Sequence, residues 1–201
     1  MEHKSDPMRL YKMRSDGSGV IVGCSKAGLD EGSLEDILEA HIEMLDPNLC
    51  VIGRQVIMGD SGRLDLLAID RNGDTAIIEL KRGRATRSVV AQVLGYAASV
   101  EGMKYDDLND IAREGHLGSC VDLRDLLRSR FGTIPETWNE HHIMYVVASE
   151  FNDTTHDIVD YLGNWDVPLY RVSFEVYRNG AEQFVRVSLV DDPPEHAEPE
   201  S

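Results

Sequence analysis

Residues 62–81 read Gly62-Arg63-Leu64-Asp65-Leu66-Leu67-Ala68-Ile69-Asp70-Arg71-Asn72-Gly73-Asp74-Thr75-Ala76-Ile77-Ile78-Glu79-Leu80-Lys81. Two short apolar segments, rich in leucine, isoleucine and alanine, flank a polar turn. The Asn72-Gly73 pair in this turn tolerates the positive φ that tight hairpin loops require. We therefore predict a β-hairpin that lies inside the central sheet of the protein.

Charged residues interrupt the two apolar arms at Asp65, Glu79 and Lys81. Side chains alternate across a strand, so Glu79 and Lys81 share one face. The register of the hairpin decides whether Asp65 joins them: a two-residue loop would turn it away, whereas a three-residue loop over 71–73, with Gly73 left-handed, sets it opposite Glu79. We predict the three-residue loop, or a bulge with the same effect.

Two carboxylates this close repel each other unless a cation lies between them or the pKa of one is raised. Mg²⁺ prefers oxygen ligands, so we expect Asp65, Glu79 and the Leu80 carbonyl to bind Mg²⁺, or Mn²⁺ in its place. Lys81 is expected to orient or help deprotonate an attacking water and to offset charge on a phosphate.

These residues, with the segment Gln92-Val93-Leu94-Gly95-Tyr96, resemble the PD-(D/E)XK nuclease superfamily in its RecB-like and NucS-like branch. The resemblance extends from about Ser33 to Tyr105. It implies a restriction-endonuclease-like α/β fold: a three-layer sandwich with a central mixed sheet flanked by helices. It also implies a Mg²⁺- or Mn²⁺-dependent endonuclease that leaves a 5′ phosphate on DNA.

The resemblance implies further site residues. Glu35, on a helix before the sheet, matches a glutamate that reaches the metal site through water or a second ion. Gln92 and Tyr96 match side chains that support the site or contact the nucleic-acid backbone. The alternatives are a solvated helix-surface glutamate for Glu35 and a tyrosine at the core margin, with a solvated hydroxyl, for Tyr96.

The formal net charge of −16 argues against nonspecific coating of nucleic acid, because that binding needs clustered Lys and Arg. It is typical of a solubilised acidic surface. Local charge differs, since several cations follow the predicted metal site directly. These cations are Arg82, Arg84 and Arg87. Together with Arg63, they are the candidate nucleic-acid-binding residues.

The chain has 201 residues, 42% hydrophobic and 28% charged, which suits one globular domain. We expect this domain to span residues 8–190, between a disordered N-terminus (1–7) and a disordered, acidic, proline-rich tail (191–201). Neither a membrane span nor a signal peptide is evident, so we expect a cytoplasmic protein. Its three cysteines lie far apart without a Cys-x-x-Cys pair, which argues against a zinc site.

Hydrophobic periodicity and turn residues predict the other elements. Helices are expected at 33–45, 87–100, 105–114, 121–130 and 154–162, and strands at 49–58, 143–149, 167–177 and 183–190, with a small hairpin over 8–24. Ser33 is the expected N-cap of the first helix, and 82–86 is the expected loop before the second. This interleaving of strands and helices predicts an α/β sandwich.

The sequence thus favours a metal-dependent DNA nuclease in DNA repair, processing or defence. Because no separate DNA-reading module is evident, a homodimer or a targeting partner is expected to complete it. A noncatalytic nucleic-acid-binding or scaffold domain that keeps the nuclease fold is the first alternative, and buried charge at an abandoned site argues against it. An RNA nuclease is the second, because the 2′-hydroxyl contacts that distinguish RNA cannot be read from the sequence.

Overall fold

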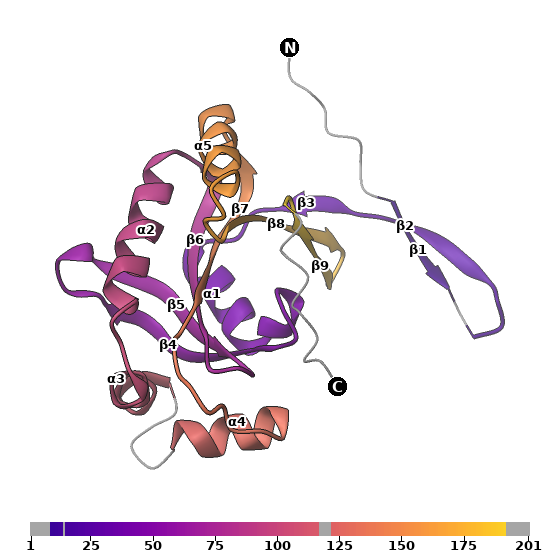
Figure 1. Cartoon of the computed structure of the whole chain (residues 1–201). Helices are drawn as coiled ribbons and strands as arrows, with labels where there is room; N and C mark the ends of the chain where they lie inside the picture. Colours follow the sequence, from indigo (N-terminus) through magenta and orange to yellow (C-terminus); the bar gives the residue numbers. More distant parts are fainter. Residues whose placement is uncertain (1–8, 14, 117–121, 192–201) are drawn as a thin grey trace.

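The computed structural model describes residues 9–13, 15–116 and 122–191. In this part of the chain a seven-stranded mixed sheet has the strand order β3-β8-β7-β6-β5-β4, and β9 also pairs with β8 (Figure 1). Its strands are β3 (Ser25–Ala27), β4 (Leu49–Ile57), β5 (Arg63–Asp70), β6 (Thr75–Ala85), β7 (His142–Phe151), β8 (Leu169–Asn179) and β9 (Glu182–Leu189). β6, β7 and β8 run parallel, whereas the other pairs are antiparallel.

Helices cover both faces of this sheet, which confirms the predicted three-layer α/β sandwich. They are α1 (Glu31–Ala40), α2 (Ser88–Val100), α3 (Tyr105–Ile111), α4 (Leu123–Phe131) and α5 (Asp153–Gly163), with 3-10 turns at Ile42–Met44 and Gly59–Ser61 and a π turn at Ala112–His116. Across the described ranges, no helix has both the length and the apolar character that crossing a bilayer requires.

A hydrophobic core lies on each face of the sheet. Side chains of α2 to α5 pack with Leu67, Ile77 and Val146 on one face. Leu34 and Leu38 of α1 pack on the other face with alternate sheet residues, which are Leu66, Ile78, Leu80 and Val147. The period-two alternation of the strands therefore divides the apolar residues of β5 and β6 between the two cores.

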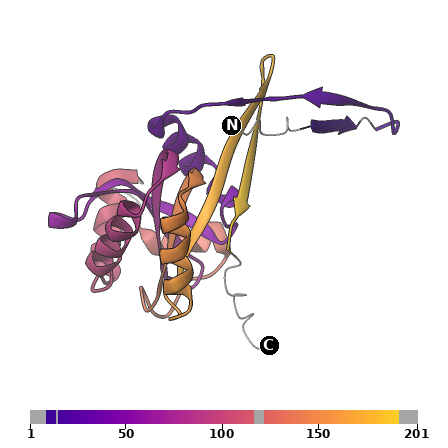
Figure 2. The ribbon, with the colours of Figure 1, turned by 90° about the horizontal axis from the view of Figure 1, so that it is seen from above.

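The first two strands form a separate hairpin. β1 (Arg9–Met13) and β2 (Gly19–Gly23) pair antiparallel, as the sequence predicted for this region. Figures 1 and 2 show this ribbon projecting as an arm from the body of the protein. Tyr11, Met13, Val20 and Ile21 of the arm are exposed.

The β5–β6 hairpin has the predicted three-residue loop. The Asp70 N–H donates to the Asp74 carbonyl at 2.9 Å, and Gly73, with φ of 90°, donates its N–H to the Asp70 carbonyl at 3.2 Å. Ile69 pairs with Thr75 and Leu66 with Ile78. The same register, extended by one residue beyond the Leu66–Ile78 pair, sets Asp65 opposite Glu79.

The start of α1 differs from the prediction. Asp30, with φ of −79° and ψ of 165°, accepts a hydrogen bond from the Ser33 N–H at 2.9 Å and is the N-cap. The assignment of Ser33 as the cap is therefore wrong: both residue types cap helices well, and the aspartate lies three residues earlier. The helix also ends at Ala40 rather than 45, where the 3-10 turn Ile42–Met44 follows.

The predicted loop at 82–86 is also wrong, because β6 continues to Ala85. Its parallel pairing with β7 shifts register between Lys81 and Arg84, and Gly83 has φ of 76°. Ala85 then pairs with Phe151. Pairing with a distant strand therefore extends a stretch whose local composition predicts a turn.

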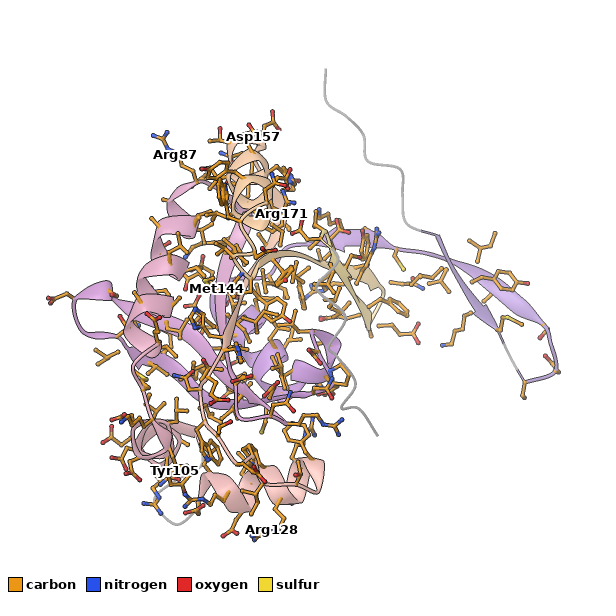
Figure 3. All side chains as sticks on the ribbon, in the orientation of Figure 1. Arg87, Tyr105, Arg128, Met144, Asp157 and Arg171 are labelled. Carbon is orange, nitrogen blue, oxygen red and sulfur yellow. The ribbon has the colours of Figure 1, made fainter. Side chains whose placement is uncertain are left out.

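Arg171 of β8 is buried and joins α5 to the end of the described chain. Figure 3 labels it beside α5. Its guanidinium donates to Asp160 of α5 and to Asp191. Asp191, which the sequence placed in the disordered tail, is thus held against β8. The predicted N-terminal segment 1–7 and the rest of the tail, 192–201, lie outside the described residues.

Gly73→Ala is expected to destabilise the protein by about 2–4 kcal/mol, from the left-handed backbone and from overpacking. A Cβ here would lie 2.6 Å from the Thr137 carbonyl oxygen and 2.9 Å from Pro135 Cγ. Gly180→Ala is the matched control, because Gly180 has φ of 60° and nothing within 4 Å of its Cβ position. It should cost only about 1–2 kcal/mol. Equal losses in urea unfolding would contradict the packing argument.

Candidate active site

β5 and β6 separate just beyond the Leu66–Ile78 pair, and the side chain of Asp65 occupies the gap. The Leu80 N–H donates to Asp65 Oδ2 at 2.8 Å. The N–H and C=O of one residue in an extended strand point to the same edge, so the Leu80 carbonyl also faces this gap. The structure therefore brings Asp65 together with the backbone of Leu80, as the sequence predicted.

Glu79 is the most deeply buried charged group of the site, with 2% of its surface exposed. Its Oε1 accepts a hydrogen bond from Lys81 Nζ at 2.6 Å, but its buried Oε2 has no hydrogen-bond partner among the residues described. Burial raises the pKa of Glu79 to about 7; the hydrogen bond from Lys81 opposes this rise, and the charge of Asp65 adds to it.

These features fit a divalent cation. An unpartnered buried carboxylate oxygen beside a second carboxylate is the arrangement that a hard cation satisfies. Asp65, Glu79 and the Leu80 carbonyl are the residues able to hold it. Within the described ranges no group of three or more His, Cys, Asp or Glu side chains surrounds a common point. The side-chain ligands would therefore come from this pair alone.

Lys81 is partly exposed beside Glu79. Burial alone would lower the pKa of Lys81, but the hydrogen bond to Glu79 and its negative charge outweigh burial, and the pKa is raised. Lys81 is therefore protonated at neutral pH in this arrangement and donates to Glu79. It also lines an open hollow of about 400 Å³, together with Lys26, Arg82 and apolar side chains such as Phe174.

Glu35 reaches the site through a residue that sequence analysis missed. Glu35 is buried, and its Oε2 accepts from Arg54 Nε at 3.0 Å, so the alternative of a solvated surface glutamate is wrong. Gln55 Nε2 donates to Glu35 Oε1 at 2.8 Å and to Asp65 Oδ1 at 3.0 Å. The one available signal was that Arg54 and Gln55 interrupt the apolar strand 49–58.

Tyr96 and Gln92 of α2 lie in different environments. Tyr96 is buried, and its hydroxyl donates to the Arg63 carbonyl at 3.0 Å, so it is not the solvated tyrosine of the alternative. Burial and the charges of Glu79 and Asp65 raise the pKa of Tyr96. The side chain of Gln92 is exposed and forms no hydrogen bond with the described residues. The structure thus brings Tyr96, but not Gln92, into contact with the strand that carries Asp65.

The four arginines predicted to bind nucleic acid are exposed. These residues are Arg63, Arg82, Arg84 and Arg87. None of their guanidinium groups forms an ion pair with a carboxylate in the described part of the chain. By contrast, Arg54 pairs with Glu35, Asp36 and Glu39. Figure 3 shows Arg87 pointing outward from the protein. Exposed positive charge therefore follows Glu79 closely along the chain.

Residues 30–114 match the family described as the endonuclease NucS C-terminal domain. This matched segment contains all the candidate site residues, which lie between Glu35 and Tyr96. No curated protein sequence matches the chain significantly.

Two solved structures share 14–15% sequence identity with the chain. One is a repair endonuclease from Pyrococcus abyssi, with 15% identity and a TM-score of 0.43 over 69% of this chain and 46% of the other. The other, described as an EndoMS–dsDNA2 complex, has 14% identity and a TM-score of 0.45 over 83% of this chain and 65% of the other. The chain therefore spans less than two thirds of the length of either.

Glu79→Gln is expected to stabilise the metal-free protein at neutral and higher pH. Glu79 has an ordinary pKa of 4.5 and a folded pKa of about 7, so between these values the folded state keeps a proton that the unfolded state has lost. Stability should fall as pH rises through this window, and the penalty persists above it. Thermal unfolding in EDTA should show the gain from Glu79→Gln growing from pH 4.5 to 7.

The matched control is Glu136→Gln, which removes an exposed carboxylate from the segment before β7. A gain from Glu79→Gln that stays constant over the same pH range would contradict the assignment of a raised pKa to Glu79.

Proposed function

We propose that this chain is a Mg²⁺- or Mn²⁺-dependent endonuclease that hydrolyses phosphodiester bonds of DNA and leaves a 5′ phosphate, in DNA repair, processing or defence. The observation that carries the proposal is the buried Oε2 of Glu79, which has no hydrogen-bond partner among the described residues and belongs to a carboxylate beside Asp65 and Lys81. The match of residues 30–114 to a family named for an endonuclease supports it.

In this proposal Asp65, Glu79 and the Leu80 carbonyl hold the metal. A bound Mg²⁺ or Mn²⁺ polarises the phosphate and lowers the pKa of the attacking water. Asp65 is already oriented for such a role, because each of its oxygens accepts a hydrogen bond from a neutral donor. Both carboxylates would have to be ionised to hold the metal, so Glu79 would have to give up the proton that burial favours.

Lys81 has a different role from the carboxylates. Its raised pKa keeps Nζ protonated, so it donates hydrogen bonds to the attacking water or to a phosphate oxygen and offsets negative charge there. An ammonium group has three N–H donors and Glu79 engages one of them, so the others remain for the water or the phosphate. Tyr96, by bonding the Arg63 carbonyl, fixes the start of the strand that carries Asp65.

The distribution of charge supports a polyanionic substrate held at this site. With a net charge of −16, most of the surface repels DNA. The exposed arginines without ion pairs among the described residues include Arg82, Arg84 and Arg87, which follow Lys81 closely in the chain. Phosphate contacts would therefore concentrate beside the carboxylate pair. A homodimer or a targeting partner would extend this small contact area and determine which DNA structure is cut.

The nuclease proposal is tested with single-stranded, duplex and branched DNA, and with RNA of the same sequence, in Mg²⁺, Mn²⁺ or EDTA. We expect metal-dependent cleavage of DNA with 5′-phosphate products, and a loss of about 10²-fold or more for Lys81→Ala, which removes the charged donor. Lys12→Ala is the matched control, because Lys12 lies on the β1–β2 arm.

Cleavage by Lys81→Ala at the wild-type rate would assign the activity to another site or to a contaminant. Cleavage of RNA alone would favour the RNA nuclease. If nothing is cut, calorimetric titration with Mn²⁺ separates the remaining possibilities: no heat, or equal heat with Asp65→Ala, would establish a noncatalytic domain.

The role of the arginines is tested by the salt dependence of DNA binding in EDTA. Arg84→Ala should weaken duplex binding and reduce the slope of log K against log salt by about 0.9, the value for one lost phosphate contact. Arg71→Ala is the matched control, since Arg71 is exposed in the β5–β6 loop at the opposite end of the hairpin from Asp65. Equal effects of both variants in fluorescence anisotropy would contradict phosphate binding beside Lys81.

A further inference from the structure

Gln55 occupies an unusual backbone position in β4. Its neighbours Arg54 and Val56 pair with Leu66 and Leu64, which places Gln55 directly opposite Asp65. Its φ is 52°, a left-handed conformation that residues other than glycine, asparagine and aspartate adopt rarely. Such backbone positions in otherwise regular elements persist only where surrounding interactions hold them, and they occur often at functional sites.

The side-chain amide of Gln55 joins two carboxylates from different layers of the protein. Nε2 donates to Glu35 Oε1 at 2.8 Å and to Asp65 Oδ1 at 3.0 Å, so both of its N–H groups are used. The amide orientation follows from chemistry, because the amide oxygen could not accept from either carboxylate. Gln55 thereby connects α1 to the strand that carries Asp65.

The neutrality of this bridge matters for the charge of Asp65. Asp65 forms no ion pair with a described cation, whereas Glu35 is paired with Arg54. Its two oxygens accept from Gln55 Nε2 and from the Leu80 N–H. A Lys or Arg at position 55 would fix the carboxylate equally well but would neutralise it. The amide fixes its direction and leaves its negative charge to attract a cation.

We propose that Gln55 is a positioning residue that holds the Asp65 carboxylate in its metal-binding orientation and couples it to Glu35 on α1. This inference rests on the proposed function. It gives Glu35 a role through the Gln55 amide, in place of the water-mediated contact expected from the sequence.

Two substitutions separate the amide bridge from the backbone conformation. Gln55→Asn keeps an amide and suits a left-handed backbone, but its side chain is one methylene too short to reach both carboxylates. Gln55→Gly removes the side chain and relieves the backbone. Relief of the left-handed backbone opposes the loss of the two amide hydrogen bonds, so both variants should still unfold cooperatively, at a temperature close to that of the wild type. Gln183→Asn, in β9, is the matched control.

Affinity for Mn²⁺, measured by calorimetry, is the decisive readout. We expect both Gln55 variants to bind Mn²⁺ about 10–100-fold more weakly than the wild type, as for other residues that orient metal ligands. Gln183→Asn should bind like the wild type. The Mn²⁺ concentration for half-maximal DNA cleavage should rise by the same factor as the dissociation constant.

The outcomes distinguish this inference from the proposed function. Wild-type affinity in both Gln55 variants would overturn the positioning role and leave the metal site standing. Weaker binding accompanied by a loss of cooperative unfolding would assign Gln55 a structural role and overturn the inference as well. No Mn²⁺ binding by the wild-type protein would overturn the proposed function, and this inference with it.

Discussion

The register of the β5–β6 hairpin is the constraint on which the candidate site depends. Side chains alternate along a strand, so a slip of one residue would carry Asp65 to the α1 face and leave Glu79 alone in the opposite core. The loop prevents this, because Gly73 accepts a hydrogen bond from Asn139 N–H at 2.8 Å and lies against Pro135 and Thr137. A turn at one end of the hairpin therefore aligns the carboxylates at the other.

Burial raises the pKa of Glu79 and destabilises the folded protein. A charged group held away from water without a full set of partners destabilises the fold, and Glu79 is in this position. The surrounding elements limit the penalty through fixed donors: Lys81 for Glu79, the Leu80 N–H and Gln55 for Asp65, and Arg54 for Glu35. These donors fix the direction of each carboxylate within the fold.

Local signals explain what the sequence could predict. The three-residue loop, the register that sets Asp65 opposite Glu79 and the alternating cores all follow from turn chemistry and period-two patterning within residues 62–81. Prediction failed where distant segments decide the structure. β6 continues to Ala85 because β7 lies beside it, and Gln55 meets Asp65 because β4 pairs with β5 through an irregular register. A left-handed glutamine in a strand has no signature in a single sequence.

The anchoring of Asp191 determines where the chain can be shortened. Arg171 is buried, and it pairs with two described carboxylates, those of Asp160 and Asp191. The side chain of Asp160 is largely exposed. Truncation after residue 190 would remove one carboxylate from a guanidinium that cannot reach bulk water, and a buried cation that loses a partner weakens its surroundings strongly. Expression boundaries drawn from the acidic, proline-rich composition of the tail would therefore cut through an interaction that fastens α5 to β8.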